Sequence, residues 1–141
     1  MSKKTASVRW LEGLVFETQT ESGHRGYLDA FPREGETSRG PTPMELVLVA
    51  VAGCTGMDVI EILRKKRLNV TGLEVKVTGT RAETYPMVYT ELDVTYIVRG
   101  KDIPASAVEQ AIKLSEEKYC SVGIMLSKSA KINSRYEIIA E

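Results

Sequence analysis

The 141-residue sequence predicts an α+β fold with the element order β-β-β-α-β-β-α-β. One long helical segment, about 24 residues within 39–67, separates two groups of short segments in which apolar and polar residues alternate. The helices lie between groups of strands and do not follow every strand. This order is typical of α+β folds and not of doubly wound folds.

The central helix has clear signals at both ends. Thr42 is a good N-cap, Pro43 suits the first helical position, and Glu45 would complete a Thr-x-x-Glu capping box. The cations at 65–67 favour a helix C-terminus. Residues 46–52 are apolar on every face, which predicts burial on all sides. Because this run is too short to cross a bilayer, we expect a core helix.

The first group of strands precedes this helix. Residues 5–19 are predicted to form two short strands, with Val8 and Trp10 alternating in the first and Leu14 and Phe16 in the second. Glu12-Gly13 between them is a hairpin signal. A third strand is expected over 25–30, followed by a loop over 32–41.

The second group of elements follows the helix. Period-two patterns predict a pair of strands over 72–78 and 90–98 and a final strand over 131–138. Pro104 and a Ser106-x-x-Glu109 box predict the start of a second helix. The expected buried stripe of that helix is Val108, Ala111, Ile112, Ser115 and Tyr119. A further short helical turn is expected over 121–127.

Composition limits the function. The chain has the length of a single domain, 1–141. Its 19 Lys plus Arg balance 19 Asp plus Glu, so no basic excess indicates nucleic acid, and no membrane partner is expected. No signal peptide is recognised, and two cysteines then favour a reducing cytoplasm. One sheet covers only one side of the central helix, so we expect a homodimer with this helix near the interface.

The two cysteines are the first candidates for chemistry. Cys54 lies in the middle of the central helix, between Gly53 and Gly56. It can be a small buried hydrophobic residue or a reactive thiolate. Each mid-helix glycine costs about 1 kcal/mol relative to alanine, so the pair indicates a close approach to the backbone. Cys120 can also be a packing residue, or it can pair with Cys54 in a reversible disulfide if their Cα atoms lie within about 7 Å.

Other titratable residues leave several alternatives. His24, the only histidine, is expected to be solvated in a polar turn, and one histidine excludes the usual two- or three-histidine metal sites. A Cys54–His24 nucleophile pair is a further alternative. Arg39 or Arg25 is either a solvated charge or a guanidinium that lowers the pKa of a thiol. Asp58, one turn beyond Cys54 on the same face, would raise the pKa of that thiol if the carboxylate is unpaired.

The segments Gly40-Pro-Thr-Pro-Met-Glu-Leu46, Gly53-Cys-Thr-Gly-Met-Asp-Val59 and Lys118-Tyr-Cys-Ser-Val122 resemble the OsmC/Ohr family, and their wording is similar to its YhfA-like branch. The resemblance extends over essentially the whole chain. It implies an intertwined α+β homodimer with two active sites at the subunit interface. It also implies a thiol peroxidase that reduces organic hydroperoxides.

Matching positions imply roles for individual residues. Cys54 corresponds to the peroxidatic cysteine and Cys120 to the resolving one. In the family a guanidinium polarises the first thiol. It comes either from the first hairpin turn, here Glu12-Gly13, or from just before the Gly-x-x-Pro leader, here Arg39. The position of the family's glutamate is Met44, and the apolar side chains Met44 and Met57 are expected to contact the substrate.

Three functions remain as hypotheses from the sequence. The first is a peroxidase in which Cys54 becomes a sulfenic acid, Cys120 condenses with it, and an external dithiol restores both thiols, without metal, haem or flavin. The second is a non-enzymatic dimer that binds a small hydrophobic ligand or senses oxidation, because Met44 replaces the glutamate. The third is a Cys–His acyl or thiol transferase.

Overall fold

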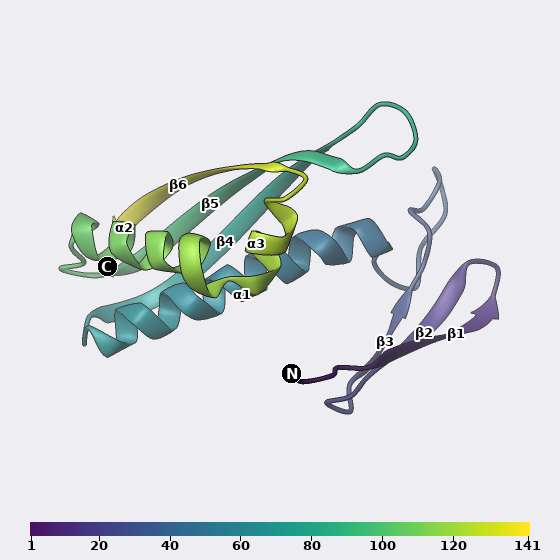
Figure 1. Ribbon diagram of the computed structural model, residues 1–141, viewed down its shortest axis with the longest axis horizontal. Helices are drawn as coiled ribbons and strands as arrows, with labels where there is room; N and C mark the ends of the chain where they lie inside the picture. The colour runs from purple at the N-terminus through teal and green to yellow at the C-terminus, as the bar shows by residue number, and fades with distance from the viewer. The chain divides into compact units, whose positions relative to one another are not determined.

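The computed structural model describes all residues from 1 to 141 (Figure 1). It divides into two compact units, 1–47 and 48–141. The strands are β1 (Ala6–Glu12), β2 (Val15–Thr20), β3 (Arg25–Leu28), β4 (Asn69–Arg81), β5 (Tyr89–Lys101) and β6 (Lys131–Ala140). The helices are α1 (Pro43–Lys65), α2 (Ala105–Leu114), the π-helical turn η1 (Ser115–Tyr119) and α3 (Ser121–Leu126). The predicted order of strands and helices is confirmed.

The first unit is built on the antiparallel sheet β1-β2-β3. Gly13 adopts a positive φ of 53° in the turn between β1 and β2, and the indole of Trp10 donates to its carbonyl oxygen at 2.8 Å. Leu14 falls in this turn with 66% of its surface exposed, and Val15 is buried in its place. The prediction that Leu14 shares a strand face with Phe16 was therefore wrong by one residue.

The start of α1 follows the predicted capping box. The backbone amide of Glu45 donates to Oγ1 of Thr42 at 3.1 Å, and the amide of Thr42 donates to Oε1 of Glu45 at 2.9 Å. These two bonds satisfy donors that would otherwise be unpaired at the helix N-terminus. The helix continues for 23 residues into the second unit and ends at Lys65, followed by Arg67 with a positive φ of 59°.

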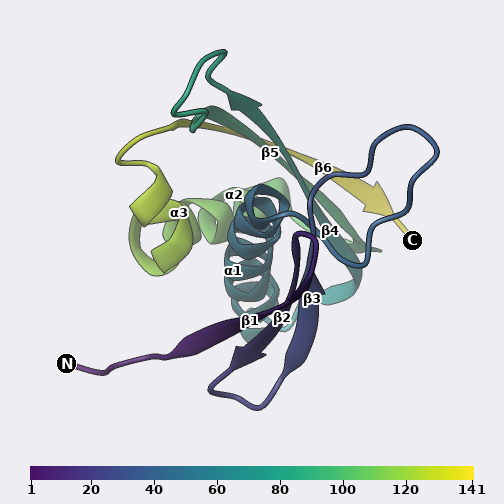
Figure 2. The ribbon, with the colours of Figure 1, turned by 90° about the vertical axis from the view of Figure 1, so that its right-hand side faces the viewer.

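The second unit is a β4-β5-β6 sheet with helices on one face (Figures 1 and 2). Strands β4 and β5 are antiparallel, whereas β5 and β6 are parallel, so the segment α2-η1-α3 crosses over between them. The alternation predicted from the sequence holds: Leu92, Val94, Tyr96 and Val98 of β5 are buried. The last three pack with Val59 and Leu63 of α1 and with α2. Strand β4 begins three residues before the predicted Gly72.

The second helix differs from its prediction at both ends. Its N-cap is Pro104, and no side chain caps it, so the expected Ser106–Glu109 box is not formed. Ser115 is buried as expected, but Tyr119 is half exposed. The π-helical turn inserts one residue per turn relative to an α-helix, which rotates later side chains by roughly 100°. The predicted stripe therefore ends at Ser115.

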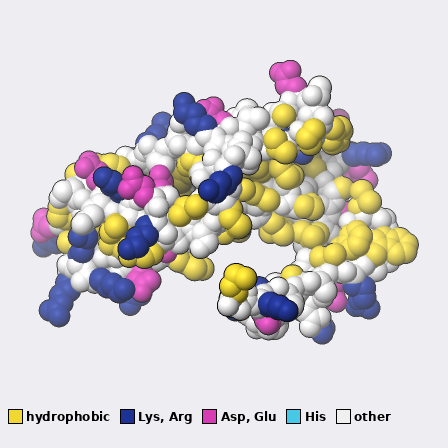
Figure 3. Space-filling view, in the orientation of Figure 1, with side chains coloured by type: hydrophobic (Ala, Val, Ile, Leu, Met, Phe, Trp, Pro, Cys, Tyr) yellow, Lys and Arg dark blue, Asp and Glu magenta, His cyan; other side chains and the backbone are white.

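Helix α1 is buried along one stripe only. Its buried residues are Val51, Thr55, Val59 and Leu63, each four residues from the next. Val49 and Met57 are 62% and 73% exposed, and hydrophobic side chains are exposed over α1 in Figure 3. The predicted burial on all faces is thus not reached within one chain. By length and composition alone α1 could cross a membrane, a test that the core helix of a soluble protein also passes.

Candidate functional site

The two cysteines meet in the second unit. Cys54 comes from the middle of α1, and Cys120 separates η1 from α3. Both are free thiols, and Cys54 is one of the groups that raise the pKa of Cys120, so the two side chains lie close enough to interact. Cys54 is partly exposed, whereas only 1% of the surface of Cys120 is accessible. The pair therefore has one thiol open to a reactant and one thiol behind it.

The position of Cys120 follows from the π-helical turn. The amide of Cys120 donates to the carbonyl oxygen of Ser115 at 2.7 Å, which closes the wide turn. Cys120 is also the N-cap of α3, where the amide of Gly123 donates to its sulfur at 3.3 Å. A Cβ atom at position 123 would lie 3.1 Å from this sulfur, so glycine permits the close approach.

The surroundings of Cys120 disfavour its thiolate. Burial raises the pKa of the Cys120 thiol from its ordinary value of 9.0 to about 11, although the hydrogen bond from Gly123 acts in the opposite direction. The interaction with Cys54 and the charge of Asp58 are smaller contributions to the same rise. The sequence had placed an unpaired Asp58 beside the Cys54 thiol. In the structure Asp58 accepts a hydrogen bond from Ser115 at 2.9 Å, and its charge acts on the pKa of Cys120.

A chain of polar groups extends from Asp58 through the core to Glu116. It passes through the hydroxyl groups of Ser115, Thr55 and Tyr96, all of which are almost fully buried. Burial raises the pKa of the Tyr96 phenol above its usual range, so this group stays protonated. The sequence analysis did not find this chain. The only local signals were polar residues within buried stripes, Thr55 on α1 and Ser115 at the end of α2.

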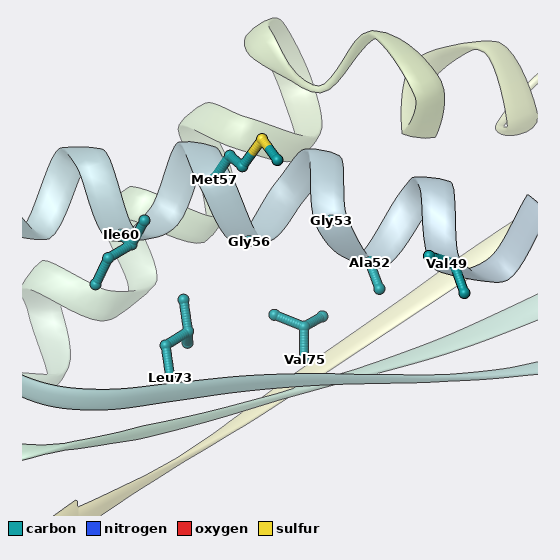
Figure 4. A pocket seen from close by; sticks show the side chains of 8 residues that line it. All are labelled: Val49, Ala52, Gly53, Gly56, Met57, Ile60, Leu73 and Val75. Atoms are coloured by element: carbon teal, nitrogen blue, oxygen red, sulfur yellow. The ribbon is translucent and has the colours of Figure 1, made fainter. Parts of the chain in front are cut away.

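An open apolar groove of about 650 Å³ lies between α1 and β4 (Figure 4). Val49, Ala52, Ile60, Leu73 and Val75 line it, together with Gly53, Gly56 and Met57. A Cβ atom on Gly56 would lie 3.4 Å from Val75, whereas one on Gly53 would meet nothing within 4 Å. Within one chain, only Gly56 is therefore close to another element.

The remaining candidates belong to the first unit. The guanidinium of Arg39 lies over the ring of Tyr27, and the backbone amide of Arg39 donates to Oδ2 of Asp29 at 3.0 Å. Met44 lies in the first turn of α1 and is partly buried. His24 is exposed in the β2–β3 turn, as expected, with Nδ1 2.9 Å from Oγ of Ser22. Arg25 is exposed at the start of β3.

The fold and the paired thiols define an α+β protein with a dithiol centre. Residues 35–135 match the family model described as OsmC-like protein, and the chain belongs to this family. The chain is 42% identical over 135 residues to Protein YhfA of Escherichia coli (strain K12), covering 96% of this chain and 98% of that protein.

Two solved structures share the fold of this chain. A hypothetical protein from Aquifex aeolicus VF5 has a TM-score of 0.88 at 33% identity, over 100% of this chain and 99% of that one. A Legionella pneumophila protein described as an organic hydroperoxide resistance protein OsmC and predicted redox protein has a TM-score of 0.68 at 15% identity, over 97% and 98% of the two chains. The predicted family and α+β fold class are confirmed.

Proposed function

We propose that the protein is a cytoplasmic thiol peroxidase that reduces organic hydroperoxides as part of oxidative stress defence. The observation that carries the proposal is the interaction between the Cys54 and Cys120 side chains, because a sulfenic acid formed on the first thiol would lie near the second. Membership of the OsmC-like family supports a role with peroxides, as does the fold shared with a protein described as an organic hydroperoxide resistance protein.

The reaction begins at Cys54. Its thiolate attacks the distal oxygen of R–O–O–H, the O–O bond breaks, and the alkoxide leaves and takes up a proton to form the alcohol. Cys54 is then a sulfenic acid. The sulfur of Cys120 attacks it, water leaves with the proton of the Cys120 thiol, and a disulfide forms. An external dithiol returns both cysteines to thiols by exchange.

The two thiols differ in a way that suits this division of roles. Cys54 is partly exposed, so a peroxide can reach it, whereas Cys120 is buried with a raised pKa and is a poor first nucleophile. The apolar groove beside Gly53 and Met57 favours the organic part of a hydroperoxide over hydrogen peroxide. We assign Met57 and Met44 to substrate contact and Arg39 to polarisation of the thiol and the peroxide.

We further propose that the working form is a homodimer. One chain leaves the apolar side of α1 uncovered, and exposed side chains such as Val49 and Met57 would be buried by a second copy. The apolar groove between α1 and β4 favours a second candidate function. In this function the dimer binds a small hydrophobic ligand without turnover.

Consumption of an organic hydroperoxide tests the peroxidase. Wild-type protein, Cys54→Ser and Cys120→Ser should be mixed with cumene hydroperoxide and dithiothreitol, with hydrogen peroxide as the second substrate. We expect turnover by the wild type with preference for the organic peroxide, none by Cys54→Ser, and a sulfenic acid trapped by dimedone in Cys120→Ser. If Cys54→Ser consumes peroxide as fast as the wild type, the proposal is wrong and the ligand-binding function is favoured.

A further inference from the structure

Three hydrogen bonds of Ser115 join the two segments that carry the cysteines. Its Oγ lies 2.7 Å from Oγ1 of Thr55, the residue that directly follows Cys54 on α1. The Ser115 hydroxyl also donates to Oδ2 of Asp58, one turn beyond Cys54 on α1, at 2.9 Å. The carbonyl oxygen of Ser115 accepts from the backbone amide of Cys120 at 2.7 Å. Ser115 therefore connects the Cys54 turn of α1 with Cys120 itself.

The bond between Ser115 and Thr55 lies inside the core. Ser115 is fully buried, and only 2% of the surface of Thr55 is accessible. The three separations around Ser115 are those of ordinary hydrogen bonds. A buried hydroxyl group that moves away from its partner loses this bond without a replacement from water, which is costly. The bonds of Ser115 therefore restrain the position of η1 against α1.

The π-helical turn directs Ser115 and Cys120 toward the same side. On a regular α-helix, five residues would rotate Cys120 about 140° away from Ser115. The additional residue of the π-helical turn takes back roughly 100°, so the two side chains lie on nearly the same face. Ser115 contacts Thr55 and Asp58 of α1 from this face. Cys120 interacts with Cys54 of the same helix, so this face is directed at α1.

The start of the π-helical turn is also attached to the sheet. Glu116 accepts hydrogen bonds from the hydroxyl group of Tyr96 on β5 at 2.7 Å and from that of Ser134 on β6 at 2.6 Å. Glu116 is thus held from the sheet, whereas Ser115 is held from α1. Both sets of bonds act at the N-terminal end of the turn that leads to Cys120.

We propose that Ser115 is a positioning residue that holds Cys120 close to Cys54 and so favours formation of their disulfide. We call Ser115 and its two partners on α1, Thr55 and Asp58, the clamp. This inference rests on the proposed peroxidase function, in which the disulfide forms in every cycle. The residues of the clamp do not react themselves. They act through the position of Cys120.

The clamp assists the step that follows oxidation of Cys54. The sulfur of Cys120 attacks the sulfenic sulfur of Cys54, the S–S bond forms and the S–O bond breaks. The hydroxyl group leaves as water with the proton of the Cys120 thiol. The hydroperoxide, which has already oxidised Cys54, is the oxidant of the cycle.

Loss of the clamp should affect the reduced protein more than the oxidised one. In the oxidised protein the covalent bond itself holds the two sulfurs together. In the reduced protein only packing and hydrogen bonds keep Cys120 close to Cys54. Without the Ser115 hydroxyl group, the reduced state gains conformational freedom that the disulfide prevents in the oxidised state. The equilibrium between the two states should therefore move toward the two thiols.

The reduction potential of the cysteine pair tests the clamp without peroxide. The disulfide is formed with diamide, which takes one hydrogen atom from each thiol, and is equilibrated with mixtures of reduced and oxidised dithiothreitol. We expect Ser115→Ala and Thr55→Val to favour the dithiol about 3- to 10-fold relative to the wild type, the factor that corresponds to one hydrogen bond. The potential should rise by about 15–30 mV, because a tenfold change equals about 30 mV for this two-electron couple.

Matched variants separate the clamp from a general loss of stability. Thr55→Ser keeps the hydroxyl group and should have the wild-type potential. Tyr136→Phe removes a hydroxyl group that contacts Glu109 of α2, outside the clamp, and should also leave the potential unchanged. A destabilisation common to both redox forms does not move the potential. Ser115→Ala and Thr55→Val remove the same hydrogen bond from its two sides, so either one suffices if circular dichroism shows that the other is unfolded.

Three results would overturn the inference. One is that Ser115→Ala, Thr55→Val and Thr55→Ser have equal potentials. Another is a shift in the opposite direction, which would mean that the hydrogen bonds keep the thiols apart. The third is a wild type in which diamide forms no disulfide between Cys54 and Cys120. If the peroxide assay fails while the potentials shift as expected, the proposed substrate is wrong and the clamp is supported.

Discussion

The guanidinium of Arg39 lies 4.7 Å from the centre of the Tyr27 ring, and its Nη1 lies 3.8 Å from Oε1 of Glu12. Arg39 comes from the loop before α1, whereas Glu12 ends β1 at the first hairpin turn. The resemblance implied a guanidinium either at the first hairpin turn, near Glu12, or at Arg39. These two positions lie next to each other within the first unit. Gly40 permits this, because a Cβ atom there would lie 2.3 Å from the carbonyl oxygen of Tyr27.

Replacement of Tyr27 by leucine should slow the reaction of Cys54 with an organic hydroperoxide about two- to fivefold. The ring of Tyr27 holds the Arg39 guanidinium, and an exposed cation–π contact is worth about 0.5–1 kcal/mol. The measurement is the rate of sulfenic acid formation in a Cys120→Ser background. Trp10→Leu removes another exposed aromatic residue of the same sheet and should leave this rate unchanged. If Tyr27→Leu and Trp10→Leu slow the reaction equally, Tyr27 has no specific effect on Cys54.

Met44→Glu should raise the rate of peroxide reduction. The ion pair of Arg39 with Glu12 is long and solvent-exposed, so it orients the guanidinium only weakly. A carboxylate at position 44 could instead form a two-point ion pair with Arg39. Stopped-flow measurements across pH compare the two proteins. A slower Met44→Glu variant would show that another residue already has the orienting role.

Met57→Asp should weaken the proposed dimer. Met57 is the most exposed large hydrophobic residue of α1, and a charge there would be buried by a second copy at high cost. Light scattering should give twice the chain mass of 15.6 kDa for the wild type and a smaller value for the variant. Tyr85→Asp, a change at an exposed aromatic residue outside α1, is the control. A wild type that is a monomer at micromolar concentration would contradict the prediction.

The stability of the protein should fall as the pH rises from about 9 to about 11. In this range the unfolded chain loses the Cys120 proton while the folded chain retains it, because the folded pKa is raised to about 11. The unfolded state therefore gains free energy of ionisation that the folded state does not. Urea unfolding of the wild type and Cys120→Ala should show a steeper decline for the wild type. If the stabilities of the wild type and Cys120→Ala fall equally with pH, the loss of stability comes from other groups, such as Tyr96.

Tyr96→Phe should lower the free energy of unfolding by about 1–3 kcal/mol. The Tyr96 hydroxyl is buried between Thr55 and Glu116, and its removal takes one hydrogen bond from each of them. Urea unfolding measures the change. Tyr85→Phe removes a hydroxyl from a side chain that is 88% exposed and should have no measurable effect. An equal effect of the two substitutions would mean that the buried hydrogen bonds contribute little.

The start of α1 and the faces of the strands were predictable because they depend on neighbours in the sequence. The Thr42–Glu45 box joins residues three apart, and alternation along β5 requires only that one face be buried. Leu14 was misplaced because its hairpin turn lies one residue later than the Glu12-Gly13 signal suggested. The identity of Cys54 and Cys120 as a pair came from the resemblance of the segments around them.

The chain from Asp58 to Glu116 could be found only in the tertiary structure. Its members come from α1, β5 and η1, and no local pattern states which hydroxyl groups will share a core. The π-helical turn, absent from the helical pattern of the sequence, places Ser115, Glu116 and Cys120 around α1. By itself the sequence determined the cap at the start of α1 and the alternation of buried and exposed residues along β5. Only packing, which brings distant hydroxyl groups within about 3 Å, decided how they are connected.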